Sequence, residues 1–120
     1  MSRHAQQLFF VAVAAICLHH SSGASAAAET KLSGAEISAA LTDVSLYAGE
    51  TTEQIFLTGG KTAYIEGGSV SHGAWKVDGD QYCSVWPPSP VWACYDVTLE
   101  GAVITFISQG GRRYPMRKAR

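Results

Sequence analysis

The pattern of hydrophobic and polar positions divides the chain into three parts. Residues 8–18 are uninterruptedly apolar, residues 33–41 have the pattern of a short capped helix, and the chain from residue 50 onward is made of short β-type runs. Turn dipeptides such as Gly59-Gly60 and Gly67-Gly68 separate these runs, which are rich in β-branched and aromatic residues. The pattern predicts a mostly β domain with one short helix.

Six strands are expected, and connections this short allow only antiparallel neighbours. The fold class predicted is therefore mostly β, an antiparallel meander of about six strands with one short N-terminal helix and one disulfide. The pattern leaves open whether the sheet is open or closes into a small barrel. The expected strands cover residues 52–58, 61–66, 72–77, 80–86, 91–99 and 102–108.

The helix is predicted over Gly34–Leu41 because Ser33 and Glu36 have the spacing of a capping box. In that motif the serine side chain accepts from the backbone N–H three residues later, and the glutamate reaches back. Leu32 and Ile37 stand at the two flanking apolar positions. An isolated helix of this length does not persist, so it should dock on the sheet through Ile37, Ala40 and Leu41.

Three assumptions align the last four strands. With Asp78-Gly79 as a two-residue turn, Trp75 faces Tyr82; with Cys83 beside Cys94, Tyr82 faces Tyr95; with Glu100-Gly101 as a two-residue turn, Tyr95 faces Phe106. One ring from each strand then falls on a single face, together with Val97 and Ile104. Since a slip of one residue would exchange the faces, this sorting predicts the interior of the domain.

The N-terminal apolar run has the features of a secretory signal peptide. Arg3 and His4 precede it, residues 8–18 are too short to span a bilayer as a helix, and Ala24-Ser25-Ala26 fits the cleavage pattern. We expect a signal peptide at 1–26, with cleavage after Ala28 as the alternative. The predicted location is periplasmic or secreted, with a single β domain at 27–111.

Export would remove Cys17 and leave Cys83 and Cys94 as an isolated pair. In an oxidising compartment such a pair predicts a disulfide. The closed loop is short, and the expected stabilisation is about 2–3 kcal/mol.

Charge is unevenly distributed. Residues 27–111 contain three basic and ten acidic residues, a net charge of −7, which does not suit nucleic acid. A basic C-terminal tail is predicted at 112–120, with a possible weak contact to an anionic surface. Its basic residues are Arg112, Arg113, Arg117, Lys118 and Arg120.

Two stretches carry a resemblance. Leu32-Ser33-Gly34-Ala35-Glu36-Ile37, and Gly73 to Cys83 with Trp75, Gly79 and Asp80, fit L-[ST]-G-x-E-[IL] followed by G-x-W-x-[VI]-x-G-D-x-x-C and a later cysteine. The chain thereby resembles a group of small exported alphaproteobacterial proteins of uncharacterised function. The resemblance implies a periplasmic β domain and implies no activity.

Residues 86–92, Trp-Pro-Pro-Ser-Pro-Val-Trp, form the most unusual segment. Prolines stiffen this loop and the disulfide holds its base, which lowers the ordering cost of recognition. In the predicted register Trp86 points with the core face and Trp92 points away. Local packing of both rings is the alternative to a binding role. The candidate binding patch comprises Val85, Trp86, Pro88, Trp92 and His72.

No catalytic or metal-binding pattern is found. His72 is the sole histidine after residue 26 and has no partner for a metal site, and Asp78-Gly79-Asp80 lacks the spacing of a calcium loop. We therefore expect neither an enzyme nor a cofactor.

Two functions remain. The first is a non-catalytic periplasmic binding or regulatory module, for example an inhibitor or partner of an envelope protein, or a glycan-binding module. The alternative is a small-ligand or lipid carrier in a closed β-barrel.

Overall fold

The computed structural model of the protein describes residues 28–119. The predicted signal peptide, with its cleavage site, and Arg120 lie outside the described residues. Within that range the chain forms one helix and nine strands. In chain order they are β1 (Thr30–Lys31), α1 (Gly34–Leu41), β2 (Val44–Ala48), β3 (Thr52–Phe56), β4 (Lys61–Glu66), β5 (Ser69–Asp78), β6 (Gln81–Val85), β7 (Ala93–Glu100), β8 (Val103–Ser108) and β9 (Arg113–Arg117).

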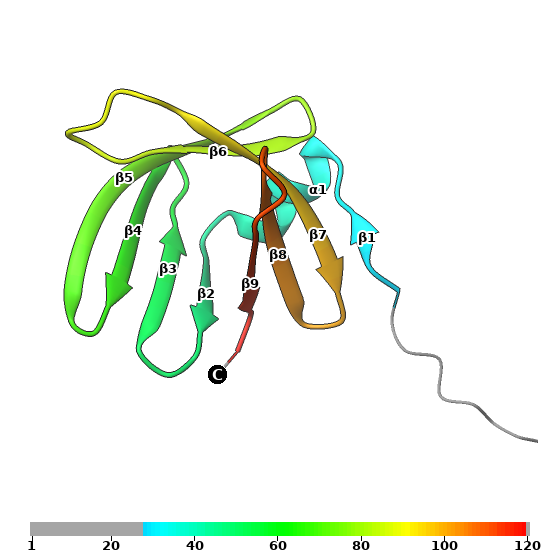
Figure 1. Cartoon of the computed structure of the whole chain (residues 1–120), viewed down its shortest axis with the longest axis horizontal. Helices are drawn as coiled ribbons and strands as arrows, with labels where there is room; N and C mark the ends of the chain where they lie inside the picture. Colours follow the sequence, from blue (N-terminus) through cyan, green and yellow to red (C-terminus); the bar gives the residue numbers. More distant parts are fainter. Residues whose placement is uncertain (1–27, 120) are drawn as a thin grey trace, which may run out of the picture.

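Eight of these strands close into an antiparallel barrel. Each strand from β2 to β8 pairs with the next along the chain, and β9 also pairs with β2, which completes the wall. The extra strand β1 pairs with Thr98 and Leu99 of β7, past residues 93–95 of the same strand, which pair with β6. Figure 1 shows this meander wrapping around a common interior. The predicted fold class is confirmed, and the closed form is the correct one of the two alternatives.

Three strands were missed, and the largest correction concerns the C-terminus. The segment predicted as a basic tail supplies β9, in which Met116 is buried and Tyr114 pairs with Phe106. Alternating polar and apolar positions make this strand, but Pro115 and the flanking arginines concealed the pattern. The second missed barrel strand is β2, whose β-type residues directly follow the helix. Both strands are needed to close the wall.

The helix prediction is confirmed in its bounds and its cap. Ser33 Oγ accepts from the Glu36 N–H at 3.3 Å, and Glu36 Oε1 accepts from the Ser33 N–H at 3.1 Å. Ile37 and Leu41 are fully buried, as expected from the spacing, and Ala40 packs against the same core.

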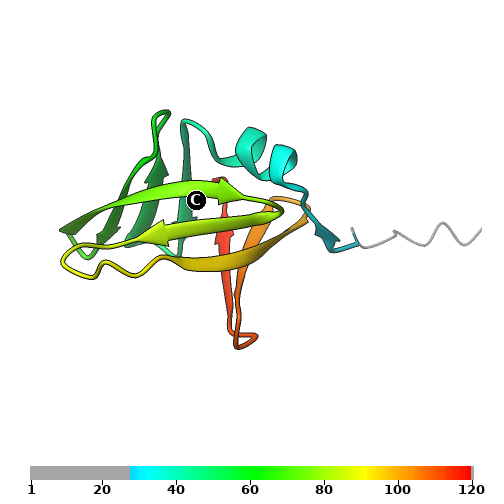
Figure 2. The ribbon, with the colours of Figure 1, turned by 90° about the horizontal axis from the view of Figure 1, so that it is seen from above.

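Two turns tie α1 to one end of the barrel. The Gly34 N–H donates to Asp80 Oδ1 at 2.8 Å, which joins the start of the helix to the β5–β6 turn. After the helix, Asp43 accepts from the Thr58 N–H at 2.8 Å and from the Thr58 hydroxyl at 2.6 Å, in the β3–β4 turn. In Figure 2 the cyan helix lies on the side of the molecule away from the β8–β9 turn. The helix thus closes one end of the barrel.

The predicted register is right at one of its three anchors. Cys83 pairs with Cys94 and Tyr82 with Tyr95, as predicted. Trp75, however, faces Ser84 and not Tyr82, while Phe106 faces Val97 and not Tyr95.

The two errors have the same cause. Each glycine occupies the first central position of its turn, with φ of 56° at Gly79 and 58° at Gly101. That position of a type II′ hairpin turn favours glycine, whereas the prediction placed each glycine second. Moving a turn by one residue shifts the pairing by two, and the inward and outward faces are therefore preserved.

The predicted interior is accordingly present. Trp75, Tyr82, Val97, Ile104 and Phe106 are all buried in one cluster. Phe56 of β3 lies at its centre, with its ring centroid 5.8 Å from that of Trp75, 5.7 Å from that of Tyr82 and 6.1 Å from that of Phe106. Leu46 of β2, together with Ile37 and Leu41 of α1, fills the rest of the interior at the end that the helix covers.

Candidate functional site

The half of the barrel away from α1 is hollow. A cavity of about 590 Å³ lies within the end formed by the β2–β3, β4–β5 and β8–β9 turns and the β6–β7 loop. This volume falls within the range of about 300–1,000 Å³ that is usual for small-molecule sites. Aromatic and small residues predominate in its lining: Ala48, Gln54, Tyr64, Ser71, Tyr82, Ser84, Trp86, Tyr95, Phe106, Arg113, Tyr114, Pro115 and Met116.

A belt of neutral hydrogen bonds separates the cavity from the packed core. Gln54 Nε2 donates to the Tyr82 hydroxyl at 3.0 Å and to Thr62 Oγ1 at 3.2 Å, and Thr62 in turn donates to the Ile55 carbonyl at 2.8 Å. Ser84 Oγ extends the belt, because it accepts from Trp86 Nε1 at 3.2 Å. The belt crosses from β3 and β4 to β6 and forms the floor of the cavity.

Burial affects the phenols of Tyr82, Tyr64 and Tyr95. It raises the pKa of Tyr82 to about 12, against the smaller opposing effect of hydrogen bonds from Ser84 and Gln54. Burial is also the main cause of the raised pKa of Tyr64 and of Tyr95. These three hydroxyls are neutral hydrogen-bonding groups in the physiological range, as tyrosine hydroxyls ordinarily are.

One pair of rings crosses over β5. Tyr64 of β4 and Trp86, just after β6, meet edge to face with their centroids 6.3 Å apart. They can meet because β5 presents Gly73 at this level. A Cβ atom on Gly73 would lie 2.7 Å from the Trp86 ring and 2.6 Å from the Val85 carbonyl oxygen. Gly73 thus lets the indole lie across the strand and line the cavity.

A second pair of rings crosses over β8. Tyr95 of β7 and Tyr114 of β9 also meet edge to face, at 6.2 Å. Between them β8 presents the small residue Ser108 opposite Tyr95. The cavity mouth is thus bordered by two aromatic pairs on different parts of the wall.

Of the neighbouring strands in the barrel wall, β2 and β9 have the fewest paired residues. These strands share a single residue pair, Tyr47 with Arg117, and each contributes lining residues, Ala48 from β2 and Met116 from β9. At the start of β9, Arg113 forms an ion pair with Glu29, just before β1. The hydrogen bond from Arg113 is the main cause of the lowered pKa of the Glu29 carboxyl.

The predicted patch does not form one surface. Trp86 lines the cavity, whereas His72 of β5 and Trp92, just before β7, are exposed on the outer face, where Lys76 lies over the Trp92 ring. Val85 is half-buried on that outer face opposite Ala74, and Pro88 is exposed in the β6–β7 loop. The opposite directions predicted for Trp86 and Trp92 are those observed.

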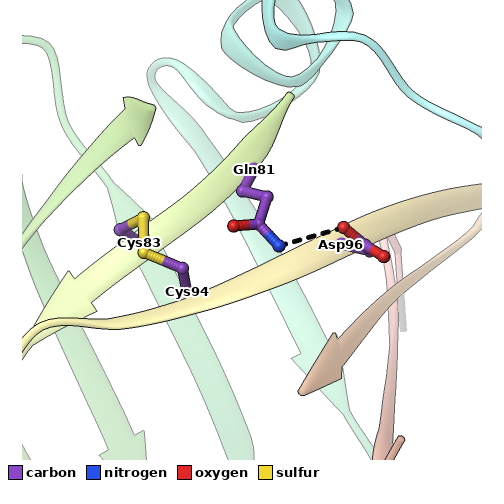
Figure 3. Close-up of a disulfide and its surroundings, with 4 residues drawn as sticks. All are labelled: Gln81, Cys83, Cys94 and Asp96. Carbon is purple, nitrogen blue, oxygen red and sulfur yellow. Dashed lines mark hydrogen bonds between the residues drawn. A yellow bond between two sulfur atoms is a disulfide. The ribbon is translucent and has the colours of Figure 1, made fainter. Parts of the chain in front are cut away.

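The disulfide lies on the outer face beside Trp92. Figure 3 shows Cys83 and Cys94 joining β6 to β7, next to the hydrogen bond from Gln81 Nε2 to Asp96 Oδ1 at 3.1 Å. Lys76 pairs with Cys83 across the sheet, and its Nζ lies 4.3 Å from the centroid of the Trp92 ring. Val91, the next residue toward the loop, is 70 % exposed.

The basic C-terminal residues are spread around β9. Arg112 lies in the β8–β9 turn, Arg113 and Arg117 are exposed at the two ends of the strand, and Lys118 follows it. They form the rim and wall of the barrel, so the prediction of a separate tail is wrong for residues 112–119.

The sequence predicted Trp86, Tyr82, Tyr95 and Phe106 as inward residues and left a ligand-carrying closed barrel as an alternative, but it did not identify the other residues that line the cavity. Gln54, Tyr64 and Tyr114 are among the other residues of its wall. Alternation along residues 52–56 and 62–66 places Gln54 and Tyr64 with Phe56 and Thr62 on one face, which is the signal that could have found them. Closure of the barrel is what brings them opposite Tyr95.

Comparisons with protein-family models, with curated proteins and with solved structures give no match to this chain. Within residues 28–119, no group of three or more His, Cys, Asp and Glu side chains could hold a metal ion. No helix in the same range is long and apolar enough to cross a membrane.

Proposed function

We propose that the protein binds a small, largely apolar molecule in the open half of its barrel. The observation that carries this proposal is the cavity of about 590 Å³, lined mainly by aromatic and small residues with a few neutral polar groups. This combination of apolar walls and few orienting polar groups is typical of ligand sites, as is a position in the mouth of a barrel. The role is that of a carrier or sensor and not of a catalyst.

We place this function outside the cytoplasm, in the periplasm or the secreted fraction. The Cys83–Cys94 disulfide supports this location, since such bonds persist in oxidising compartments. The alphaproteobacterial resemblance points to the same compartment.

A cavity-filling variant tests the proposal. Nile red is an uncharged dye whose fluorescence rises in apolar surroundings, and we expect it to bind the protein saturably. Ala48→Trp places a large ring in the cavity wall and should weaken binding at least about tenfold, or about 1.4 kcal/mol. Ala102→Trp makes the same change in the exposed β7–β8 turn, at the other end of the barrel, and should leave binding unchanged.

Circular dichroism would verify that both variants keep the β fold. Absence of saturable dye binding to the unmodified protein would refute the proposal, as would equal affinity of the Ala48→Trp variant and the unmodified protein.

A second candidate function is recognition of an envelope protein through the outer face beside the disulfide. Trp92 is 39 % exposed and Val91 70 % exposed there, although both are large and apolar. Exposed tryptophan is favoured at interface hot spots. The stiff β6–β7 loop holds both residues in place.

Trp92→Ala tests the second candidate. Because the ring is exposed, its removal should leave the melting temperature nearly unchanged while abolishing capture of a partner from periplasmic extract. The cation–π contact with Lys76 contributes only about 0.5–1 kcal/mol at an exposed site. A large drop in melting temperature would instead assign Trp92 to the support of the disulfide.

A further inference from the structure

The shape of the cavity limits the class of ligand. The cavity reaches inward as far as the belt of Gln54, Tyr82 and Ser84. Beyond the belt, Phe56, Leu46 and the buried residues of α1 fill the interior. A long acyl chain needs a deep, narrow apolar channel, whereas this cavity occupies only one half of the barrel. A short, broad ligand fits better than an extended one.

The walls offer faces and edges of aromatic rings. Six of the lining residues are aromatic, and the Tyr64–Trp86 and Tyr95–Tyr114 pairs hold four of these rings across β5 and β8. Aromatic rings interact best through offset stacking or edge-to-face contact, which adds to the gain from area burial. Since each pair holds its rings in place, a flat ligand can use these contacts with little ordering cost.

The charge of the site indicates a neutral ligand. Among the lining residues, all within the described part of the chain, Arg113 is the only one charged at neutral pH, and it forms an ion pair with Glu29. The phenols are protonated at neutral pH, as tyrosine ordinarily is, and burial raises the pKa of Tyr82 and of Tyr95 further. The floor instead presents amide and hydroxyl groups, which suit a hydroxyl or carbonyl group on the ligand.

We propose that the cavity takes a flat, uncharged aromatic molecule carrying a hydrogen-bonding group, with its rings between the two aromatic pairs and its polar group at the belt. This inference rests on the proposed function, since it specifies the ligand class of the same cavity. It excludes long-chain lipids as the main ligand.

Three alcohols with the same number of carbon atoms test the ligand class by equilibrium dialysis. They are 2-naphthol, which is flat and aromatic, decahydro-2-naphthol, which has the same skeleton without aromaticity, and 1-decanol, which is a flexible chain. The protein is expressed as the full chain and purified with its disulfide formed. We expect 2-naphthol to bind about tenfold more tightly than decahydro-2-naphthol, and 1-decanol to bind more weakly still. The ionised 2-naphthoate should bind more weakly than 2-naphthol.

Two substitutions at Tyr114, which is 43 % exposed and not part of the packed core, locate the effect. Tyr114→Leu removes a ring of the second pair and should reduce the preference for 2-naphthol over decahydro-2-naphthol. Tyr114→Phe keeps the ring and should preserve that preference. Equal loss in both variants would contradict a role for the ring.

The outcomes separate this inference from the proposed function. If decahydro-2-naphthol or 1-decanol binds as tightly as 2-naphthol and Ala48→Trp blocks it, the cavity is a ligand site but the aromatic class is wrong. If 2-naphthoate binds more tightly than 2-naphthol, the uncharged class is wrong. If none of the probes binds, both the inference and the proposed function fail.

Discussion

Phe56→Ala is expected to lower the free energy of unfolding by about 3–5 kcal/mol. The Phe56 side chain is fully buried at the centre of the aromatic cluster, in contact with Trp75, Tyr82 and Phe106. Removing it loses the burial of a whole ring and leaves a void that these rigid neighbours cannot fill. The void would also lie directly below the floor of the cavity.

Urea unfolding followed by tryptophan fluorescence measures this loss. Leu57→Ala, at the next residue, is the control, because Leu57 is 44 % exposed in the β3–β4 turn and should cost much less. A loss below about 1 kcal/mol in Phe56→Ala would mean that Phe56 is not the centre of the core. The half of the barrel near α1 would then not be tightly filled, and the cavity would not be confined to the other half.

Removal of the disulfide has the second largest expected effect. The double variant Cys83→Ala/Cys94→Ala should lose about 2–3 kcal/mol, because Cys83 and Cys94 are only 11 residues apart and the loop they close is short. A typical domain has only about 5–15 kcal/mol in total, so the loss is a large share. The double variant should remain folded at low temperature, because the aromatic core does not depend on the bridge.

Reductant supplies the matched control for this prediction. Dithiothreitol should lower the denaturation midpoint of the unmodified protein toward that of the double variant, and it should leave the double variant unchanged. Coincident unfolding curves for the oxidised and reduced protein would show that the disulfide contributes nothing to stability.

The two aromatic pairs suggest how stability and binding are divided in this barrel. The half near α1 is filled by Ile37, Leu41, Leu46 and Phe56, which supply the core. In the other half, Gly73 and Ser108 leave room for rings that cross over their strands. A small barrel fully packed with side chains would have no cavity. The small residues at these two positions are therefore what makes a binding site possible.

The sequence predicted correctly those features that depend on residues close together in the chain. Ser33 and Glu36 define the helix start, and the alternation around Tyr82, Tyr95 and Phe106 places these rings on the inward face. Side chains alternate strictly along a strand, so the faces survived even though both turns were misplaced. The pairing of Cys83 with Cys94 was likewise correct, and these are the two cysteines within residues 28–119.

Closure of the barrel was decided only by the tertiary structure. It depends on β9 meeting β2, two strands far apart in sequence that share one residue pair, Tyr47 with Arg117. No short-range pattern encodes such a contact, because its free energy comes from burying Met116 and Leu46 in a core that all eight strands build together. The cavity follows from the same closure, since Gln54, Tyr64 and Tyr114 face Tyr95 only when the wall is complete.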